Sequence, residues 1–312
     1  MAANGGTLEG TPPAPEQSEE PDWRDSFGSV ADRDDLLASH RYGFVPRTIL
    51  DFKNDDKWHL PIPNLEELMG QVEHRRSFAF EDGGIGKSLR ATAFNSGLCK
   101  FLVQYYTDRG QQVLDPFAGW GTRAYVCRRL GRNYLGYDVV RTTVDAVNGA
   151  LARVEQRAID GEKAYGLARV ILGDGCKLEG MDDASADALF TCPPYHDREV
   201  YGEAAEGAGY QLSRVDRYYF ELFMRRAFER WRQVLKRDAL AVFVVSDWRD
   251  HDTGEYYPFT HKLQEWAFAA GFTMHDFAVH GLRSLTVRGV SSFMQSRILP
   301  RAHENIVVFR RG

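Results

Sequence analysis

The sequence predicts an α/β fold: a mostly parallel, Rossmann-like sheet with helices on both faces and a closing antiparallel strand. Short apolar runs of strand length alternate with longer segments whose apolar residues recur at helical spacing. An aspartate stands at or just after the end of three of these runs. The 312 residues, 43% of them hydrophobic, are enough for one large domain of this kind with appendages.

The predicted elements alternate along the chain. Helices are expected where apolar residues recur three or four positions apart, at 96–107, 123–130, 144–154, 219–231 and 261–270. Strands are expected at the short apolar runs 112–115, 134–138, 169–172, 188–191, 239–245 and 305–309. Strands that alternate with helices favour a mostly parallel sheet that is covered on both faces.

Composition divides the chain into three parts. Residues 1–29 are rich in Gly, Pro, Glu and Ala without periodicity, and we expect a disordered tail. Residues 30–87 predict an ordered N-terminal extension of unassigned fold, and residues 88–312 predict the main domain. Residues 277–303 form either a target-recognition segment or a solvated loop. This segment contains no acidic residue, and its arginines are Arg283, Arg288, Arg297 and Arg301.

Charge and cysteine usage exclude several classes of protein. The net charge of -5 excludes a molecule that is basic overall, although local patches rather than net charge meet phosphates. No apolar run approaches the roughly 20 residues that span a bilayer, and no signal peptide is evident. The cysteines show neither metal-site spacing nor the density of a disulfide scaffold; they are Cys99, Cys127, Cys176 and Cys192. We expect a cytoplasmic protein with reduced thiols, no bound metal and no membrane partner.

The segment Asp115–Thr122, Asp-Pro-Phe-Ala-Gly-Trp-Gly-Thr, joins a predicted strand to a predicted helix. In α/β sheets ligands bind beyond the carboxyl ends of the strands, where this loop falls. Gly119 and Gly121 allow a tight turn and close approach of a ligand to the backbone. The dinucleotide-binding spacing G-x-G-x-x-G is absent. Taken alone, the loop is equally well explained as an ordinary glycine turn.

Two further aspartates favour a nucleoside site at the same edge of the sheet. Asp138 ends the second predicted strand, and Asp174 follows the third. A carboxylate after the second strand suits a pair of ribose hydroxyls, because it accepts two hydrogen bonds at once. Asp174 is placed to accept from an adenine amino group. The alternative for each aspartate is a helix cap.

The segment Cys192–Tyr195, Cys-Pro-Pro-Tyr, ends the fourth predicted strand. Its two prolines fix the backbone and remove two donors, which leaves carbonyl groups free to accept. The aromatic ring of Tyr195 can stack on a planar base. A proline-stiffened turn is the alternative, but the position at the carboxyl edge favours a functional role.

Together these motifs resemble those of the S-adenosylmethionine-dependent amino-methyltransferases that modify cytosine N4 or adenine N6 in DNA. Asp115–Thr122 resembles their cofactor motif, and Cys192–Tyr195 resembles their catalytic D/N/S-P-P-Y/W. The segments 96–107 and 301–309 resemble the helix before the cofactor loop and the closing strand. The resemblance covers roughly residues 88–310 and implies the Rossmann-like class I methyltransferase fold, a DNA substrate and a setting of DNA methylation and restriction-modification.

The resemblance also implies roles for individual residues. Asp138 would hold the ribose of S-adenosylmethionine, and Asp174 its adenine. Catalysis would fall to the catalytic motif, where Pro193 and Tyr195 would contact the target base beside Cys192 and Pro194. The cofactor loop would bind the rest of the cofactor, with Asp115 and Gly119 at its methionine part; its binding residues are Asp115, Phe117, Gly119, Gly121 and Thr122.

Cys192 departs from the family pattern, which has Asp, Asn or Ser at this position. A thiol is a weak acceptor for the target amine, so either the Pro193 carbonyl does this work or the chemistry differs. The preceding Thr191 makes the string similar to the T-S-P-P-Y of cytosine-N4 enzymes, which slightly favours cytosine. The alternatives are an RNA substrate, carbon-5 methylation with Cys192 as nucleophile, and a catalytically degenerate binding protein. The oligomeric state is not predicted.

Overall fold

The computed structural model describes the greater part of the chain. The described residues are 48–63, 65, 73–74, 94–156, 166–196, 199–200, 208–250, 253–282, 297 and 302–312. No helix in these ranges is both long and apolar enough to cross a membrane.

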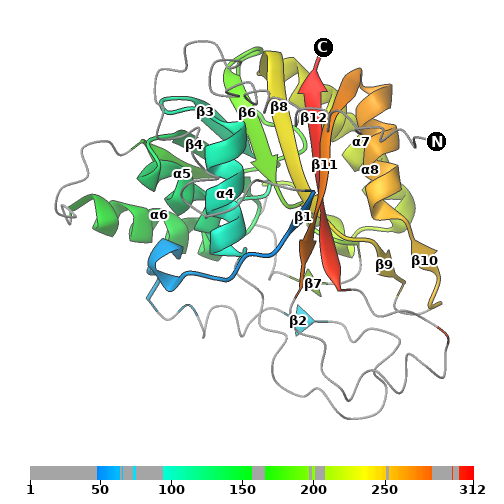
Figure 1. The fold of residues 1–312 in the computed structure, drawn as a ribbon, viewed down its shortest axis with the longest axis horizontal. Helices are drawn as coiled ribbons and strands as arrows, with labels where there is room; N and C mark the ends of the chain where they lie inside the picture. Colours follow the sequence, from blue (N-terminus) through cyan, green and yellow to red (C-terminus); the bar gives the residue numbers. More distant parts are fainter. Residues whose placement is uncertain are drawn as a thin grey trace, which may run out of the picture.

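One sheet of eight strands dominates the described residues, in the order β1-β11-β12-β8-β6-β3-β4-β5 (Figure 1). The pairs β4–β5, β3–β4, β3–β6 and β6–β8 are parallel, whereas β12 is antiparallel to both β8 and β11. The strands are β1 (Ile49–Leu50), β3 (Gln112–Asp115), β4 (Asn133–Asp138), β5 (Ala168–Leu172), β6 (Ala186–Thr191), β8 (Leu235–Val245), β11 (Phe272–Gly281) and β12 (His303–Arg311). The predicted Rossmann-like fold with a closing antiparallel strand is confirmed.

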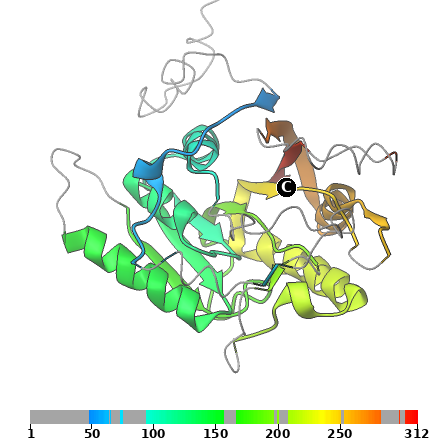
Figure 2. The same cartoon turned by 90° about the horizontal axis from the view of Figure 1, so that it is seen from below.

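Helices cover both faces of the sheet (Figure 2). One face carries α4 (Ser96–Tyr106), α5 (Thr122–Arg129) and α6 (Arg141–Gln156), and the other carries α7 (Arg217–Val234) and α8 (Phe259–Ala269). The alternation of side chains along a strand produces the two layers. In β8, for example, Val242 and Val244 pack in the first layer, whereas Phe243 and Val245 pack in the second.

The order of the strands creates a switch point between β3 and β6. From β3 the chain proceeds through α5 to β4 and through α6 to β5 on one side, and it then crosses to β6 on the other side of β3. Ligands of open α/β sheets bind at such points, beyond the carboxyl ends of the strands. The predicted cofactor loop follows β3 and the predicted catalytic motif follows β6, so both lie at this switch point.

Strand β11 was not predicted. Only its last residues alternate in burial, and a β-bulge between Met274 and Asp276 interrupts the pairing with β12. Its last residues, 277–281, fall inside the segment that the sequence analysis assigned either to target recognition or to a solvated loop. Most of that segment, with Arg283, Arg288 and Arg301, lies outside the described residues.

The described part of the expected N-terminal extension packs on the main domain. Strand β1 pairs in parallel with β11, and the short helix η2 (Asp56–Trp58) follows it. Leu50, Trp58 and Leu60 are buried in the same core layer as α4, α5 and α6. The boundary expected between residues 87 and 88 stays a prediction.

Short elements complete the described fold. Strand β2 (Glu73–His74) pairs with β7 (Glu199–Val200), and β9 (Trp248–Arg249) pairs with β10 (Tyr256–Tyr257). The 3-10 helix η4 (Leu212–Arg214) precedes α7 and approaches the carboxyl edge of the sheet.

Candidate functional site

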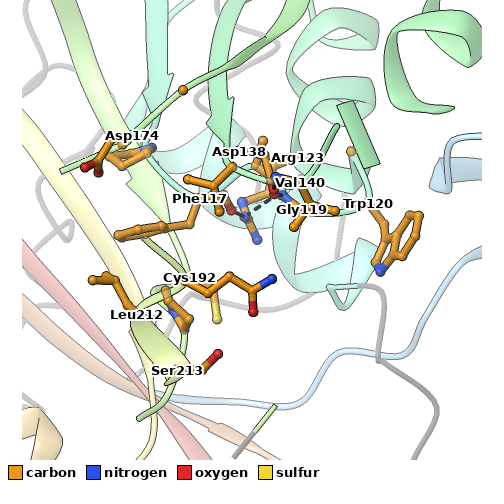
Figure 3. A pocket seen from close by; sticks show the side chains of 18 of the residues that line it. Phe117, Gly119, Trp120, Arg123, Asp138, Val140, Asp174, Cys192, Leu212 and Ser213 are labelled. Atoms are coloured by element: carbon orange, nitrogen blue, oxygen red, sulfur yellow. Dashed lines mark hydrogen bonds between the residues drawn. The ribbon is translucent and has the colours of Figure 1, made fainter. Parts of the chain in front are cut away.

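A pocket opens at the switch point, between the loop after β3 and the segment that contains η4. Figure 3 shows Asp174 and Trp120 on opposite sides of it, with Asp138, Gly119 and Cys192 between them. Its lining includes six of the residues that the sequence analysis assigned to the cofactor, namely Phe117, Gly119, Gly121, Thr122, Asp138 and Asp174. From the catalytic motif it includes Cys192 and Pro194.

The glycines of the cofactor loop are there for two different reasons. Gly119 has a φ of 52° and Gly121 a φ of 77°, backbone angles that residues with a side chain rarely adopt. Gly121 also has no room for a side chain, because a Cβ there would lie 2.7 Å from Val147 and 2.9 Å from Leu60. Gly121 is the N-cap of α5, and Thr122 and Arg123, the first two residues of that helix, line the pocket.

Asp115 lies beneath the loop, and the pocket lining does not include it. Its carboxylate is fully buried and accepts hydrogen bonds from Tyr134 Oη and Thr191 Oγ1, both at 2.7 Å, and from the Phe117 amide at 3.1 Å. The guanidinium of Arg123 pairs with it at 2.5 Å. This surrounding ties the loop to β4, β6 and α5, and it differs from the expected contact with the methionine part of a cofactor.

Two neighbours of Asp115 that can titrate, Arg123 and Tyr134, both keep their protons near neutral pH. Burial alone would lower the pKa of Arg123, but the adjacent Asp115 carboxylate raises it above its usual value. Burial, followed by the charge of Asp115, raises the pKa of Tyr134 well above its usual value. Arg123 therefore stays cationic and Tyr134 stays protonated, so both remain donors to Asp115.

Asp138 lines the pocket and is held in place by two amides. Its Oδ1 accepts from the Val140 amide at 2.9 Å, and its Oδ2 accepts from the Gly119 amide at 3.0 Å. Burial raises the pKa of its carboxyl to about 6, although the two amides oppose the shift. Each carboxylate oxygen has a second acceptor site, so the group can also bind hydroxyl donors in the pocket.

Asp174 lies at the end of the pocket that the segment 208–213 closes. Its Oδ1 accepts from the Cys176 amide at 2.9 Å, and Lys177 Nζ lies 3.6 Å from its Oδ2. A Cβ at Gly209 would lie 2.8 Å from the Cβ of Asp174. The approach of the segment to Asp174 therefore depends on a glycine at position 209, which also has a φ of 121°.

The catalytic motif presents its residues to different surroundings. Cys192 is half-buried and its thiol faces the pocket (Figure 3), whereas Pro193 is buried and does not line it. Tyr195 also does not line the pocket. Its ring meets Trp248 and Phe259 edge to face, with centroids 5.4 and 5.9 Å apart. The structure thus brings Cys192 and Pro194 to the cofactor loop and sets Tyr195 beside the β9–β10 hairpin.

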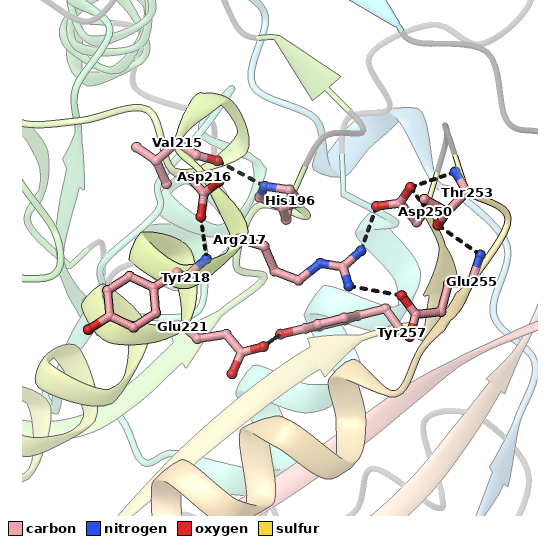
Figure 4. A network of polar contacts seen from close by, with 10 residues as sticks. All are labelled: His196, Val215, Asp216, Arg217, Tyr218, Glu221, Asp250, Thr253, Glu255 and Tyr257. Carbon is pink, nitrogen blue, oxygen red and sulfur yellow. Dashed lines mark hydrogen bonds and ion pairs between the residues drawn. The ribbon is translucent and has the colours of Figure 1, made fainter.

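A polar network joins that hairpin to the start of α7 (Figure 4). Arg217 Nη2 lies 2.6 Å from Asp250 Oδ2, and its Nη1 lies 3.1 Å from Glu255 Oε2. Its guanidinium also lies over the ring of Tyr257, which stacks on Trp248 with centroids 4.4 Å apart. The hairpin and its tryptophan are therefore fixed relative to α7, and Trp248 in turn supports Tyr195.

Much of the pocket wall was not predicted from the sequence. Phe94, Trp120 and Arg123 line it on the side of α4 and α5, and the stretch 210–213 forms the wall opposite the loop. Trp120 lies in the cofactor motif and Arg123 directly follows it, so the position of the motif could have predicted that both line the pocket. The stretch 210–213 carries no motif, and only the structure places it there.

Comparisons with known proteins point to one family. Residues 51–148 match a family model described as DNA methylase. The type II methyltransferase M1.MboII of Moraxella bovis is 32% identical over 106 residues, which are 33% of this chain and 40% of that protein. The chain thus spans 40% of the length of this curated relative. These matches confirm the resemblance to the DNA methylases.

Solved structures with a similar overall shape are distant. A SAM-dependent methyltransferase from Methanosarcina mazei has a TM-score of 0.46 and 13% identity over 67% of this chain and 96% of its own. TrmN from Thermus thermophilus has a TM-score of 0.46 and 14% identity over 70% of this chain and 49% of its own. The strand order given above, rather than either likeness, defines the fold.

Proposed function

We propose that this chain, which resembles the DNA methylases, is an S-adenosylmethionine-dependent methyltransferase acting on an exocyclic amine of a base in DNA. One observation carries the proposal. A single pocket at the switch point brings Gly119, Asp138 and Asp174 together with Cys192 and Pro194. A nucleoside-shaped cofactor site and a motif suited to an amine thus share one cavity.

The pocket residues fit the nucleoside part of S-adenosylmethionine. Asp138 is oriented by two amides and offers both oxygens to a pair of ribose hydroxyls. Asp174 keeps an oxygen that is free of backbone hydrogen bonds for an adenine amino group, and Lys177 lies beside that oxygen. Phe117 and Leu212 add apolar side chains to the lining, as a flat aromatic ring requires.

The rest of the cofactor loop serves the methionine part. Gly119, Gly121 and Thr122 line the pocket, and a Cβ at Gly119 would meet no atom within 4 Å, so the loop backbone is open to a ligand there. Asp115 acts as a positioning residue, because it anchors this loop to β4 and β6 through buried hydrogen bonds. When bound, the cofactor supplies a methyl group that is already activated on a sulfonium centre.

The catalytic motif serves the target amine. An exocyclic amine is out of reach inside a duplex, so the base has to leave the stack and enter the pocket. The carbonyl of Pro193 accepts a hydrogen bond from the amine and keeps its lone pair directed at the methyl group, since the thiol of Cys192 is a weak acceptor. Tyr195, whose ring Trp248 and Phe259 hold just outside the pocket lining, is the aromatic group of the motif that is available to stack on the base. Correct orientation and exclusion of water supply most of the rate.

Cytosine N4 is the favoured target atom, with adenine N6 as the alternative. The string Thr-Cys-Pro-Pro-Tyr at 191–195 resembles the Thr-Ser-Pro-Pro-Tyr of cytosine-N4 enzymes. The Thr191 hydroxyl is committed to Asp115, so its role in this chain is to tie the catalytic motif to the cofactor loop.

The test is transfer of tritiated methyl from S-adenosylmethionine to DNA and, in parallel, to RNA, followed by mass spectrometry of the nucleosides. N4-methylcytosine or N6-methyladenine in DNA supports the proposal and identifies the base. Label in RNA alone contradicts the DNA substrate, and label on carbon 5 of cytosine makes Cys192 the nucleophile instead. A protein that binds the cofactor and labels neither polymer contradicts the proposed activity.

A further inference from the structure

Four aromatic rings form a continuous surface beside the pocket. Tyr210 stacks on Phe223 with ring centroids 5.5 Å apart and an interplanar angle of 8°. Tyr219 lies next to Phe223 at 6.2 Å, and Tyr218 meets Tyr219 edge to face at 5.4 Å. We call these four residues, Tyr210, Tyr218, Tyr219 and Phe223, the aromatic platform.

The rings of the platform are exposed, whereas those of an aromatic cluster in the core would be buried. Tyr210, Tyr218 and Tyr219 are 61%, 69% and 52% exposed, respectively. Tyr218 lies on the far side of the start of α7 from the hairpin network (Figure 4). Contiguous exposed aromatic groups next to a pocket are typical of an interaction surface.

The platform lies at the substrate edge of the sheet. Tyr210 lines the pocket as well as stacking on Phe223, so the platform begins at the pocket itself. Helix α7 ends directly before β8, which is parallel to β6, so its first turn lies at the edge where the catalytic motif leaves β6. Tyr218 and Tyr219 belong to that first turn.

Positive charge accompanies the rings. Arg214, Arg225 and Arg226 are exposed, and none of the three forms an ion pair with the part of the chain that the structure describes. Arg226 follows Phe223 by three residues and Arg225 follows Tyr218 by seven, so each shares a helix face with a platform ring. The exposed carboxylate of Asp216 caps α7 through the Tyr218 amide.

We propose that the aromatic platform binds unpaired bases of DNA that flank the extruded target base, an inference that rests on the proposed function. Aromatic side chains stack on any base, and nearby arginines neutralise the phosphates between them. Protein partners are disfavoured, because the exposed arginines on the helix that carries the rings, Arg225 and Arg226, suit a polyanion. Extrusion of a base unstacks its neighbours, and the platform offers those neighbours a replacement surface next to the pocket.

The experiment is fluorescence anisotropy of labelled single-stranded and duplex DNA, with S-adenosylhomocysteine present so that no transfer occurs. Tyr219→Ala is expected to weaken binding of single-stranded DNA about tenfold, because it removes one stacking ring. Tyr219→Phe keeps the ring and is expected to bind as the wild type does. The matched control is Tyr105→Ala, which removes a 50% exposed tyrosine at the opposite end of the sheet, near the end of α4.

Salt dependence separates stacking from charge. Arg226→Gln is expected to lower the slope of log affinity against log salt by about one, whereas Tyr219→Ala leaves the slope unchanged. The inference is overturned if Tyr218→Ala and Tyr219→Ala bind DNA as the wild type does, or if they lose binding of RNA but not of DNA. Failure of methyl transfer by the wild type would overturn the proposed function instead, because this binding assay does not depend on transfer.

Discussion

Two aspartates that end neighbouring strands of the sheet have different surroundings. Asp115 is fully buried and already accepts from Arg123, Tyr134 and Thr191, so it fixes the loop. Asp138 accepts from two backbone amides in the described part of the chain and faces the pocket. The sequence alone predicts that each of these two aspartates lies at the end of a strand. Which of the two faces a ligand depends on side chains brought in by β4 and β6, and that was not predictable from local spacing.

The pKa of about 6 at Asp138 predicts a pH dependence of cofactor binding. The carboxylate binds ribose hydroxyls better than the carboxylic acid does, so affinity for S-adenosylmethionine should fall below pH 6, by up to about tenfold per pH unit. Isothermal titration calorimetry from pH 7.5 to pH 5 measures this. Asp138→Asn should bind more weakly than the wild type at pH 7.5 and lose the pH dependence assigned to this group. If the variant keeps the same pH profile, Asp138 is not the titrating group.

The same pKa has the opposite effect on the stability of the ligand-free protein. The folded-state pKa is raised above the usual value of 3.8, so the folded state binds the proton more tightly than the unfolded state. The buried carboxylate therefore costs stability at neutral pH, and this cost is relieved as the pH falls through about 6. As the pH falls through about 6, protonation of Asp138 should therefore weaken cofactor binding while it stabilises the fold. General acid unfolding would instead lower cofactor affinity and stability together.

Cys192 offers a direct test of the amine-transfer chemistry. Serine accepts hydrogen bonds better than cysteine, and Cys192→Ser keeps the size of the side chain. If the residue helps to orient an amine, the rate of transfer should rise by roughly fivefold, which corresponds to about 1 kcal/mol. Cys192→Ala lacks the acceptor and should not gain. Single-turnover methylation of DNA provides the rates, and loss of transfer in the serine variant would indicate a cysteine nucleophile instead.

At the scale of elements, the turn between β3 and α5 depends on Gly121. Gly121→Ala combines a strained φ of 77° with close contacts to Val147 and Leu60. Gly110 has a similar φ of 81° and no atom within 4 Å of its position for a Cβ, so Gly110→Ala isolates the strain. We expect about 1 kcal/mol of destabilisation for the control, and a larger loss together with weaker cofactor binding for Gly121→Ala. Equal losses of unfolding free energy, measured in urea, would contradict the packing argument.

The elements with clear periodicity were predictable from the sequence. The helices α4 to α8 and the strands β3 to β6, β8 and β12 all lie where their apolar patterns indicate. Strand β11 was missed because a bulge and exposed polar residues mask its alternation. The wall at 210–213 was missed for another reason: tertiary packing against Asp174 and Phe223, rather than a local pattern, places it over the pocket.

At the scale of the whole molecule, the site depends on elements from both core layers. Helix α5 belongs to the layer with α4 and α6, whereas α7 belongs to the other, and Phe117 of the cofactor loop packs against Trp231 of α7. Residues 51–148, which match the DNA methylase model, supply the cofactor loop and Asp138. The catalytic motif, the wall at 210–213 and the hairpin come from the rest of the chain. A pocket of this kind forms only when the whole sheet is assembled, which predicts that cofactor binding and folding are coupled.

Residues 49–62 pack on the main domain and should fold together with it. A substitution of Trp58 tests this expectation. Its ring is buried in the layer with α4 and α5, with Lys100 Nζ 4.3 Å and Arg129 Cζ 4.2 Å from its centroid. We expect Trp58→Ala to lower the free energy of unfolding by about 3 kcal/mol in one cooperative urea transition. The exposed Lys53→Ala is the matched control and should have little effect. If the extension were a separate unit that ends near residue 87, circular dichroism would instead show an unchanged main transition in the tryptophan variant.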